Sequence, residues 1–110
     1  MGTGIGADNT EIALVELGQV VERPTLIRCG SSGGLQPEVR TGDLVISRAA
    51  YRLETTSTHF VGEGFPAFAD HEVQLALLEA AERNGVSHHL GVTASSPGFY
   101  GAQDLSLIHI

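Results

Sequence analysis

The pattern of apolar and polar positions divides the chain into helices and strands. From about Asn9 to about Val20, apolar residues recur every three or four positions, which predicts an amphipathic helix. A wider apolar stripe opens at Asp70 or His71 and ends at Asn84-Gly85, a pair typical of a helix C-terminus. Three apolar runs have the length of strands, namely Thr25 to Cys29, Gly42 to Ala50 and Val86 to Ser95.

The order helix, strand, strand, helix, strand predicts an α/β layered fold, whose ligands collect at the carboxyl ends of strands. Asp8 and Glu11 fit a capping box that opens the first helix. The segment from Tyr51 to Pro66 has no clean period and is predicted to be a long loop. Loops of this length in a compact domain are usually functional or disordered.

One stretch, TLIRCGSSGGLQP at residues 25–37, combines an arginine, two serine hydroxyls and three glycines. Arg28 lies in an apolar run, where a buried guanidinium needs a fixed partner. The glycines allow backbone N–H groups to approach a ligand, and Ser31 and Ser32 add hydroxyl donors. These groups predict a cradle for an oxyanion or phosphate. The alternative for the glycines is a plain structural turn.

The same glycines match the nucleophile elbow of α/β-hydrolases, with the serine at the centre of GSSGG (residues 30–34). His59 or His71 and Asp70 are conceivable partners for a catalytic triad. That elbow needs a helix directly after the serine. Pro37 and the strand that follows leave no room for one, so the sequence disfavours a serine hydrolase.

Two further patterns are weak. The glycines of GTGIG (residues 2–6) resemble part of a dinucleotide fingerprint, but the next strand does not end at an acidic residue that would hold a ribose. His88 and His89 could suggest a metal site. Adjacent residues of a strand point to opposite faces, however, so a shared ion is not expected. No metal site is predicted.

Composition narrows the choice of partner and compartment. The 110 residues suffice for one domain, the apolar fraction is 42%, and the net charge is -7 with six basic residues, all arginine. An acidic chain is not expected to bind nucleic acid or an anionic membrane, although a few arginines can still form a local anion site. The single cysteine, Cys29, is predicted to be a small buried side chain. A single cysteine, the lack of a long apolar run and the lack of a signal peptide predict a cytoplasmic protein.

Phe99, Tyr100 and Gln103 follow the last predicted strand. Two aromatic rings in a loop can simply pack against the domain. Alternatively, a ring can stack on a base, while a primary amide offers a donor and an acceptor to the edge of a heterocycle. The residues alone leave both interpretations open.

Four longer segments resemble the nucleoside phosphorylases of the uridine phosphorylase type. They are GIGADNTEIALVEL, LIRCGSSGGLQPEVRTGDLVI, THFVGEGFPAFAD and GVTASSPGFYGAQ, and the resemblance runs from Gly4 to about Gln103. It implies a three-layer αβα fold, incomplete in this chain, and a pentosyltransferase reaction in which uridine and phosphate give uracil and ribose 1-phosphate. Inorganic phosphate is then a co-substrate, and no cofactor is implied.

The resemblance also implies roles for individual residues. Arg28 falls on the phosphate-binding arginine of the family, and Ser31 on a hydroxyl that binds phosphate and ribose. Ser32 and Gly33 fall on positions that line the base site, Phe99 on an aromatic residue that packs on base and sugar, and Gln103 on an amide that reads the pyrimidine. Relatives of this type form homo-oligomers, so the parent protein is expected to do the same.

Alternatives within and outside the superfamily remain. Hydrolytic nucleosidases usually have an uncharged residue where Arg28 stands, and purine-specific members usually lack the FYxxQ arrangement of Phe99 and Gln103. Both features favour a pyrimidine nucleoside phosphorylase over a purine nucleoside phosphorylase or a nucleosidase. A different class of function is a small non-catalytic module that binds an anion or a nucleotide.

The resemblance further implies that the chain is an internal fragment. Family members carry an arginine two residues after the glutamine, where this chain has Leu105, and a later Glu-Met-Glu segment that binds ribose. The last six residues, LSLIHI, equal the translation of a transposase adapter, ctgtctcttatacacatc. We therefore expect a partial phosphorylase domain at residues 1–104 and an adapter-derived tail at residues 105–110.

Overall fold

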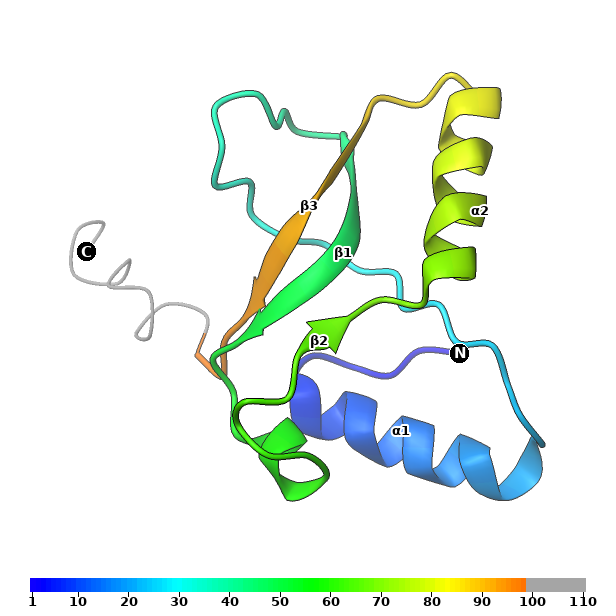
Figure 1. Cartoon of the computed structure of the whole chain (residues 1–110), viewed down its shortest axis with the longest axis vertical. Helices are drawn as coiled ribbons and strands as arrows, with labels where there is room; N and C mark the ends of the chain where they lie inside the picture. The colour runs from blue at the N-terminus through cyan, green and yellow to red at the C-terminus, as the bar shows by residue number, and fades with distance from the viewer. Residues whose placement is uncertain (99–110) are drawn as a thin grey trace. The chain divides into compact units, whose positions relative to one another are not determined.

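The computed structural model describes residues 1–98 and contains a small mixed α/β arrangement (Figure 1). The described residues fall into two compact units. The first unit comprises residues 1–28, 52–65 and 95–98, and the second comprises residues 29–51 and 66–94. Neither helix in this part of the chain is long and apolar enough to cross a membrane.

The second unit is built on a three-stranded sheet in the order β2-β1-β3, formed by β1 (Leu44–Arg52), β2 (Ala67–Phe68) and β3 (His88–Ser95). β2 is antiparallel to β1, with Ala49 opposite Phe68 and Ala50 opposite Ala67. β3 runs parallel to β1, because the Leu44 N–H donates to the Ser87 carbonyl at the start of both strands and the Leu53 N–H donates to the Ser95 carbonyl at their end. The sheet is therefore mixed.

Helix α2 (His71–Arg83) connects the antiparallel strand β2 to the parallel strand β3. The Asp70 carboxylate caps its N-terminus by accepting from the Val73 N–H at 3.0 Å. The helix ends at Asn84, and Gly85 follows with a φ of 62° that favours glycine. The helix predicted from the apolar stripe and the Asn-Gly pair is therefore confirmed at its N-terminus and at its C-terminus.

Apolar side chains of α2 and of the sheet face a shared groove. Ile46 of β1 and Ala81 of α2 are 8% and 5% exposed, and they are the buried hydrophobic side chains of the described residues. A groove of about 260 Å³ separates the helix from β1 at this point. Its lining is almost entirely aliphatic and consists of Leu44, Ile46, Leu77, Ala80, Ala81, Asn84 and Val86.

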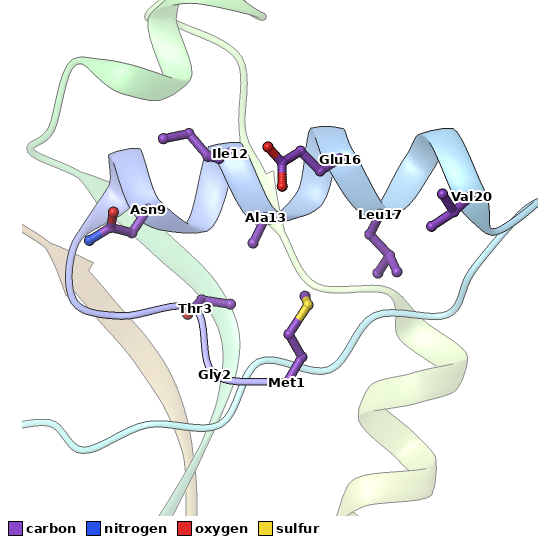
Figure 2. A pocket seen from close by; sticks show the side chains of 9 residues that line it. All are labelled: Met1, Gly2, Thr3, Asn9, Ile12, Ala13, Glu16, Leu17 and Val20. Carbon is purple, nitrogen blue, oxygen red and sulfur yellow. The ribbon is translucent and has the colours of Figure 1, made fainter.

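The first unit contains helix α1 (Ala7–Val20) and the short 3-10 helix η1 (Thr56–His59). Helix α1 was predicted correctly, but the capping box was not: Gly6 is the N-cap and makes no side-chain hydrogen bond. The Asp8 carboxylate instead accepts a hydrogen bond from the Thr56 hydroxyl, which ties α1 to η1. A groove of about 480 Å³ separates one face of α1 from the segment Met1–Thr3 (Figure 2).

The loop predicted from Tyr51 to Pro66 is confirmed from Leu53 onward and contains η1, whereas Tyr51 and Arg52 belong to β1. The Arg52 guanidinium donates to the carbonyls of Gly62 and Glu63, at 2.7 Å in each case. Two charge-assisted bonds to carbonyl oxygens close this loop on itself.

The strand predicted from Thr25 to Cys29 is wrong. Residues 24–35 have no regular secondary structure, Leu26 is 48% exposed and Ile27 is 54% exposed. An apolar run becomes a strand only when its backbone groups pair with a neighbour, and this run finds none within residues 1–98. Cys29 is exposed for the same reason, contrary to prediction. The strands predicted at Gly42 and at Val86 are confirmed, each with its start shifted by two residues to Leu44 and His88.

Asp43 links the start of β1 to β3. Its carboxylate Oδ2 accepts from the Arg40 N–H at 2.8 Å and lies 2.9 Å from Nε2 of His89. The hydrogen bond from the Arg40 N–H holds the pKa of the Asp43 carboxyl well below its usual range, and hydrogen bonds from the Ser87 and His89 side chains lower it further. His88, the neighbour of His89, places Nδ1 2.8 Å from the Val86 carbonyl, so the two histidines have different partners.

We expect Asp70→Ala to lower the free energy of unfolding by about 1 kcal/mol, because the Val73 N–H loses its acceptor at the start of α2. Chemical unfolding followed by circular dichroism measures this change. Asp70→Ser is the matched control, since its hydroxyl also accepts from that N–H, and it should stay close to the unsubstituted chain. Equal losses for alanine and serine would contradict a capping role.

We expect Asp43→Asn to lower the free energy of unfolding at neutral pH and to flatten its dependence on pH in acid. The folded-state pKa of Asp43 is depressed, so the stabilisation is present above the unfolded pKa of about 3.9 and is lost as the pH falls toward the folded value. Urea unfolding between about pH 3 and pH 7 should therefore show the difference from the unsubstituted chain shrinking below about pH 4.

The control for this titration is Glu79→Gln. It removes a pair with Arg83 in which both side chains are 71% exposed, and exposed pairs contribute between about 0 and 1 kcal/mol. A difference between Asp43→Asn and the unsubstituted chain that stays constant through the acid range would show that the Asp43 carboxylate is not stabilised by its contacts.

Candidate functional site

The glycine segment, residues 30–34, lies in the second unit and presents its polar groups to solvent. Ser31, Ser32 and Gly33 are exposed and belong to no helix or strand. A Cβ placed on Gly33 would meet nothing within 4 Å, so the space beside this backbone is open. The two hydroxyls and the adjacent backbone N–H groups are therefore accessible to a ligand from solution.

Gly34 lies close to Val39, which follows it after the turn at residues 36–39. A Cβ on this residue would lie 3.1 Å from Cγ1 and 3.2 Å from Cβ of Val39. Either distance is tighter than an ordinary van der Waals contact, so a larger residue at position 34 displaces the Val39 side chain. The glycine thus allows the chain before this turn to pack against the chain after it.

Arg28 belongs to the first unit, as the last residue of its segment 1–28. Ser31, Ser32 and Gly33 belong to the second unit. The Arg28 side chain is exposed, which corrects the expectation of a guanidinium inside an apolar strand. Among residues 1–98 no hydrogen bond or ion pair engages this guanidinium. An arginine in this state retains all its N–H donors, and their planar arrangement suits phosphate or carboxylate.

Phe99 and Gln103, the remaining predicted site residues, lie outside the described residues. The described chain ends just before them, where the Ser96 hydroxyl donates to the Gly98 carbonyl at 3.2 Å. In the first unit, the Leu53 N–H donates to the Ser95 carbonyl at 2.8 Å, which fixes the end of β3 beside the end of β1. The base-binding roles of Phe99 and Gln103 stay predictions.

Neither groove of the described chain contains a predicted site residue. Both grooves are lined mainly by aliphatic side chains, which suit packing against apolar groups rather than an anion. Within residues 1–98, no three side chains of histidine, cysteine, aspartate or glutamate lie close enough to hold a metal ion. The predicted anion-binding residues of the described chain therefore lie outside both grooves, with Ser31, Ser32 and Gly33 in the second unit and Arg28 in the first.

Sequence reasoning missed the contact between Asp43 and His89. The sequence marks Asp43 only as part of a turn, and 46 residues separate the two in the chain. The side chain of Asp43 is 10% exposed and that of His89 is 32% exposed. Adjacent histidines at the start of a strand were the available signal, since their side chains must point to opposite faces of the sheet and therefore meet different neighbours.

Comparison with known proteins places these features in a family. Residues 1–106 match the family model described as the phosphorylase superfamily. A uridine phosphorylase of Thermococcus kodakarensis is 52% identical to the chain over 101 residues, which is 92% of this chain and 36% of that protein. A uridine phosphorylase of Escherichia coli is 46% identical over 102 residues, 93% of this chain and 40% of that protein.

A guanosine phosphorylase of Halorubrum lacusprofundi is 38% identical over 103 residues, covering 93% of this chain and 42% of that protein. The chain thus spans about two fifths of the length of the relatives that it matches. The match to the family model extends through α1, the glycine segment, the sheet and α2. On this ground the chain belongs to the phosphorylase superfamily.

Proposed function

We propose that this chain is part of a uridine phosphorylase, which transfers the ribosyl group of uridine to phosphate. The observation that carries the proposal is the 52% identity to a uridine phosphorylase over 92% of the chain. The exposed donors of the glycine segment and of Arg28 support it, because phosphate is the anion that such a reaction needs. The partners in this proposal are a pyrimidine nucleoside and inorganic phosphate.

In this proposal Arg28 and Ser31 bind phosphate. Arg28 can present two parallel N–H groups to two phosphate oxygens, and the Ser31 hydroxyl adds a third donor. Charge-assisted bonds contribute roughly 1.5 to 3 kcal/mol each. The phosphate is thereby held as the nucleophile, and its oxygen forms the new bond to C1′ of the ribose.

The nucleoside occupies the other side of the reacting carbon. We assign its contacts to Ser31, Ser32, Gly33, Phe99 and Gln103. As the glycosidic bond breaks, its electron pair leaves with the base, so negative charge develops on uracil and positive charge on the sugar. An amide N–H of Gln103 that shortens onto the base at this stage stabilises the transition state more than the ground state.

A second candidate is phosphorolysis of a purine nucleoside. The guanosine phosphorylase from Halorubrum lacusprofundi, at 38% identity, is the observation that favours it. The two candidates share the phosphate site at Arg28 and differ in the groups that read the base. Comparing uridine with guanosine as substrates therefore separates them.

We also propose a cytoplasmic homo-oligomer for the complete protein.

Residues 105–110 are proposed to derive from a sequencing adapter. Resequencing the source gene across codon 105 should give a different continuation, because adapter DNA is not part of the gene. Genomic DNA that encodes LSLIHI at this position would refute the adapter origin.

We expect a chimera to show phosphate-dependent release of uracil from uridine. In this chimera residues 4–103 of the chain replace the matched residues of the Thermococcus kodakarensis protein, which supplies the remaining length. In that background Arg28→Ala should lower kcat/KM about 100-fold or more, because two bonds of roughly 1.5 kcal/mol to phosphate are lost. Uracil release is followed by its absorbance at several phosphate concentrations.

Arg83→Ala is the matched control in the chimera, since Arg83 forms an exposed pair with Glu79 on α2, and it should leave kcat/KM unchanged. The isolated 110-residue chain should release no uracil, because it spans only about two fifths of its relatives. A folded chimera that is inactive on uridine and active on guanosine would replace the pyrimidine proposal with the purine one. Full activity of Arg28→Ala would overturn the role of Arg28.

A further inference from the structure

The loop that carries the glycine segment returns to the sheet through a closed turn. The Asp43 N–H donates to the Arg40 carbonyl at 3.0 Å, and the Arg40 N–H donates back to Oδ2 of Asp43 at 2.8 Å. Gly42, with a φ of 97°, takes the left-handed conformation that this turn requires. Two reciprocal hydrogen bonds therefore fix the base of the loop.

A continuous series of contacts runs from this turn to the glycine segment. The Val39 N–H donates to the Gln36 carbonyl at 3.1 Å, which closes a second turn just before Arg40. The Val39 side chain lies close to Gly34, where an added Cβ would meet it at 3.1 Å and make it shift. Gly34, which closes the glycine segment just after Ser32 and Gly33, is thus linked through Val39 to the turn that ends at Asp43.

His89 connects this turn to the sheet. It stands on β3, and its Nε2 lies 2.9 Å from Oδ2 of Asp43, the same oxygen that accepts from the Arg40 N–H. The Asp43 side chain is 10% exposed and that of His89 is 32% exposed, so the contact is half-buried. Other bonds hold β1 to β3, including the Leu44 N–H to the Ser87 carbonyl and a 3.1 Å contact between the hydroxyls of Ser47 and Thr93.

We propose that Asp43 and His89 are positioning residues that fix the glycine segment on the sheet. Asp43 holds the turn at the base of the loop, and His89 holds Asp43 against β3. The sheet keeps its own ladder without this pair, so its role is local to the loop. The consequence for phosphate rests on the proposed function: a glycine segment held in one arrangement binds the anion without first having to be ordered.

The test compares substitutions of two adjacent histidines in the whole 110-residue chain. His89→Ala removes the donor to Asp43. His89→Gln keeps an N–H donor at a similar reach and is the conservative rescue. His88→Ala is the matched control, since His88 contacts the Val86 carbonyl of its own strand.

Amide hydrogen exchange and ¹⁵N relaxation, both by NMR without any ligand, give the decisive readout. In His89→Ala, exchange at the Arg40 and Asp43 amides should accelerate about threefold or more, and the order parameters of Ser31 to Gly34 should fall. Exchange at Ile46 in the sheet should not change. His89→Gln and His88→Ala should match the unsubstituted chain.

Two outcomes overturn the proposal. One is unchanged exchange and unchanged order parameters in His89→Ala. The other is acceleration of the same size at Ile46, or in His89→Gln, which would show that the histidine supports the fold as a whole or that the donor is irrelevant.

A second arm titrates the same variants with inorganic phosphate and follows the amides of Ser31 and Ser32. The apparent Kd should rise about threefold or more in His89→Ala and return in His89→Gln. If phosphate shifts none of these amides in the unsubstituted chain, the phosphate-binding role assigned to this segment fails. The exchange data still decide the positioning role, so the two failures are distinguishable.

Discussion

The structure depends on the pairing of backbone hydrogen bonds along β1. This strand is the centre of the sheet, with β2 antiparallel on one side and β3 parallel on the other. A backbone N–H or C=O group that is buried without a hydrogen-bond partner costs free energy. The central strand therefore determines the positions of the strands that pair with its two edges. Ile46 on β1 and Ala81 of α2 are both buried, and both line the groove between the strand and the helix.

The same constraint explains which elements could be predicted from the sequence. Helix α2 is specified locally, because its cap at Asp70, its apolar stripe and the glycine at position 85 all lie within the helix or next to it. A strand is specified by a partner that is distant in the sequence. The apolar run at residues 25–29 has the composition of a strand and finds no partner within residues 1–98, so composition alone gave the wrong structure there.

The candidate site likewise contains residues that local sequence identifies and contacts that depend on strand pairing. Arg28, Ser31, Ser32 and Gly33 could be singled out from local chemistry, since a guanidinium followed by hydroxyls and glycines indicates an anion ligand in any fold. The contact of Asp43 with His89 could not, because it joins the turn before β1 to strand β3, and these are brought together only when β1 pairs with β3. Residue types predict what a site can bind, whereas the long-range pairing decides how firmly the site is held.

How firmly the glycine segment is held matters more here than total charge. The chain carries a net charge of -7, so the overall field of the described protein does not favour the approach of an anion. In the proposed function, phosphate is bound by a few donors at short range, where a displacement of about 1 Å weakens a hydrogen bond sharply. An exposed loop of glycines and serines has no stiffness of its own. The arrangement of these donors therefore depends on contacts outside the segment, and the described structure provides them through Val39, the turn at Arg40, and the pair of Asp43 with His89.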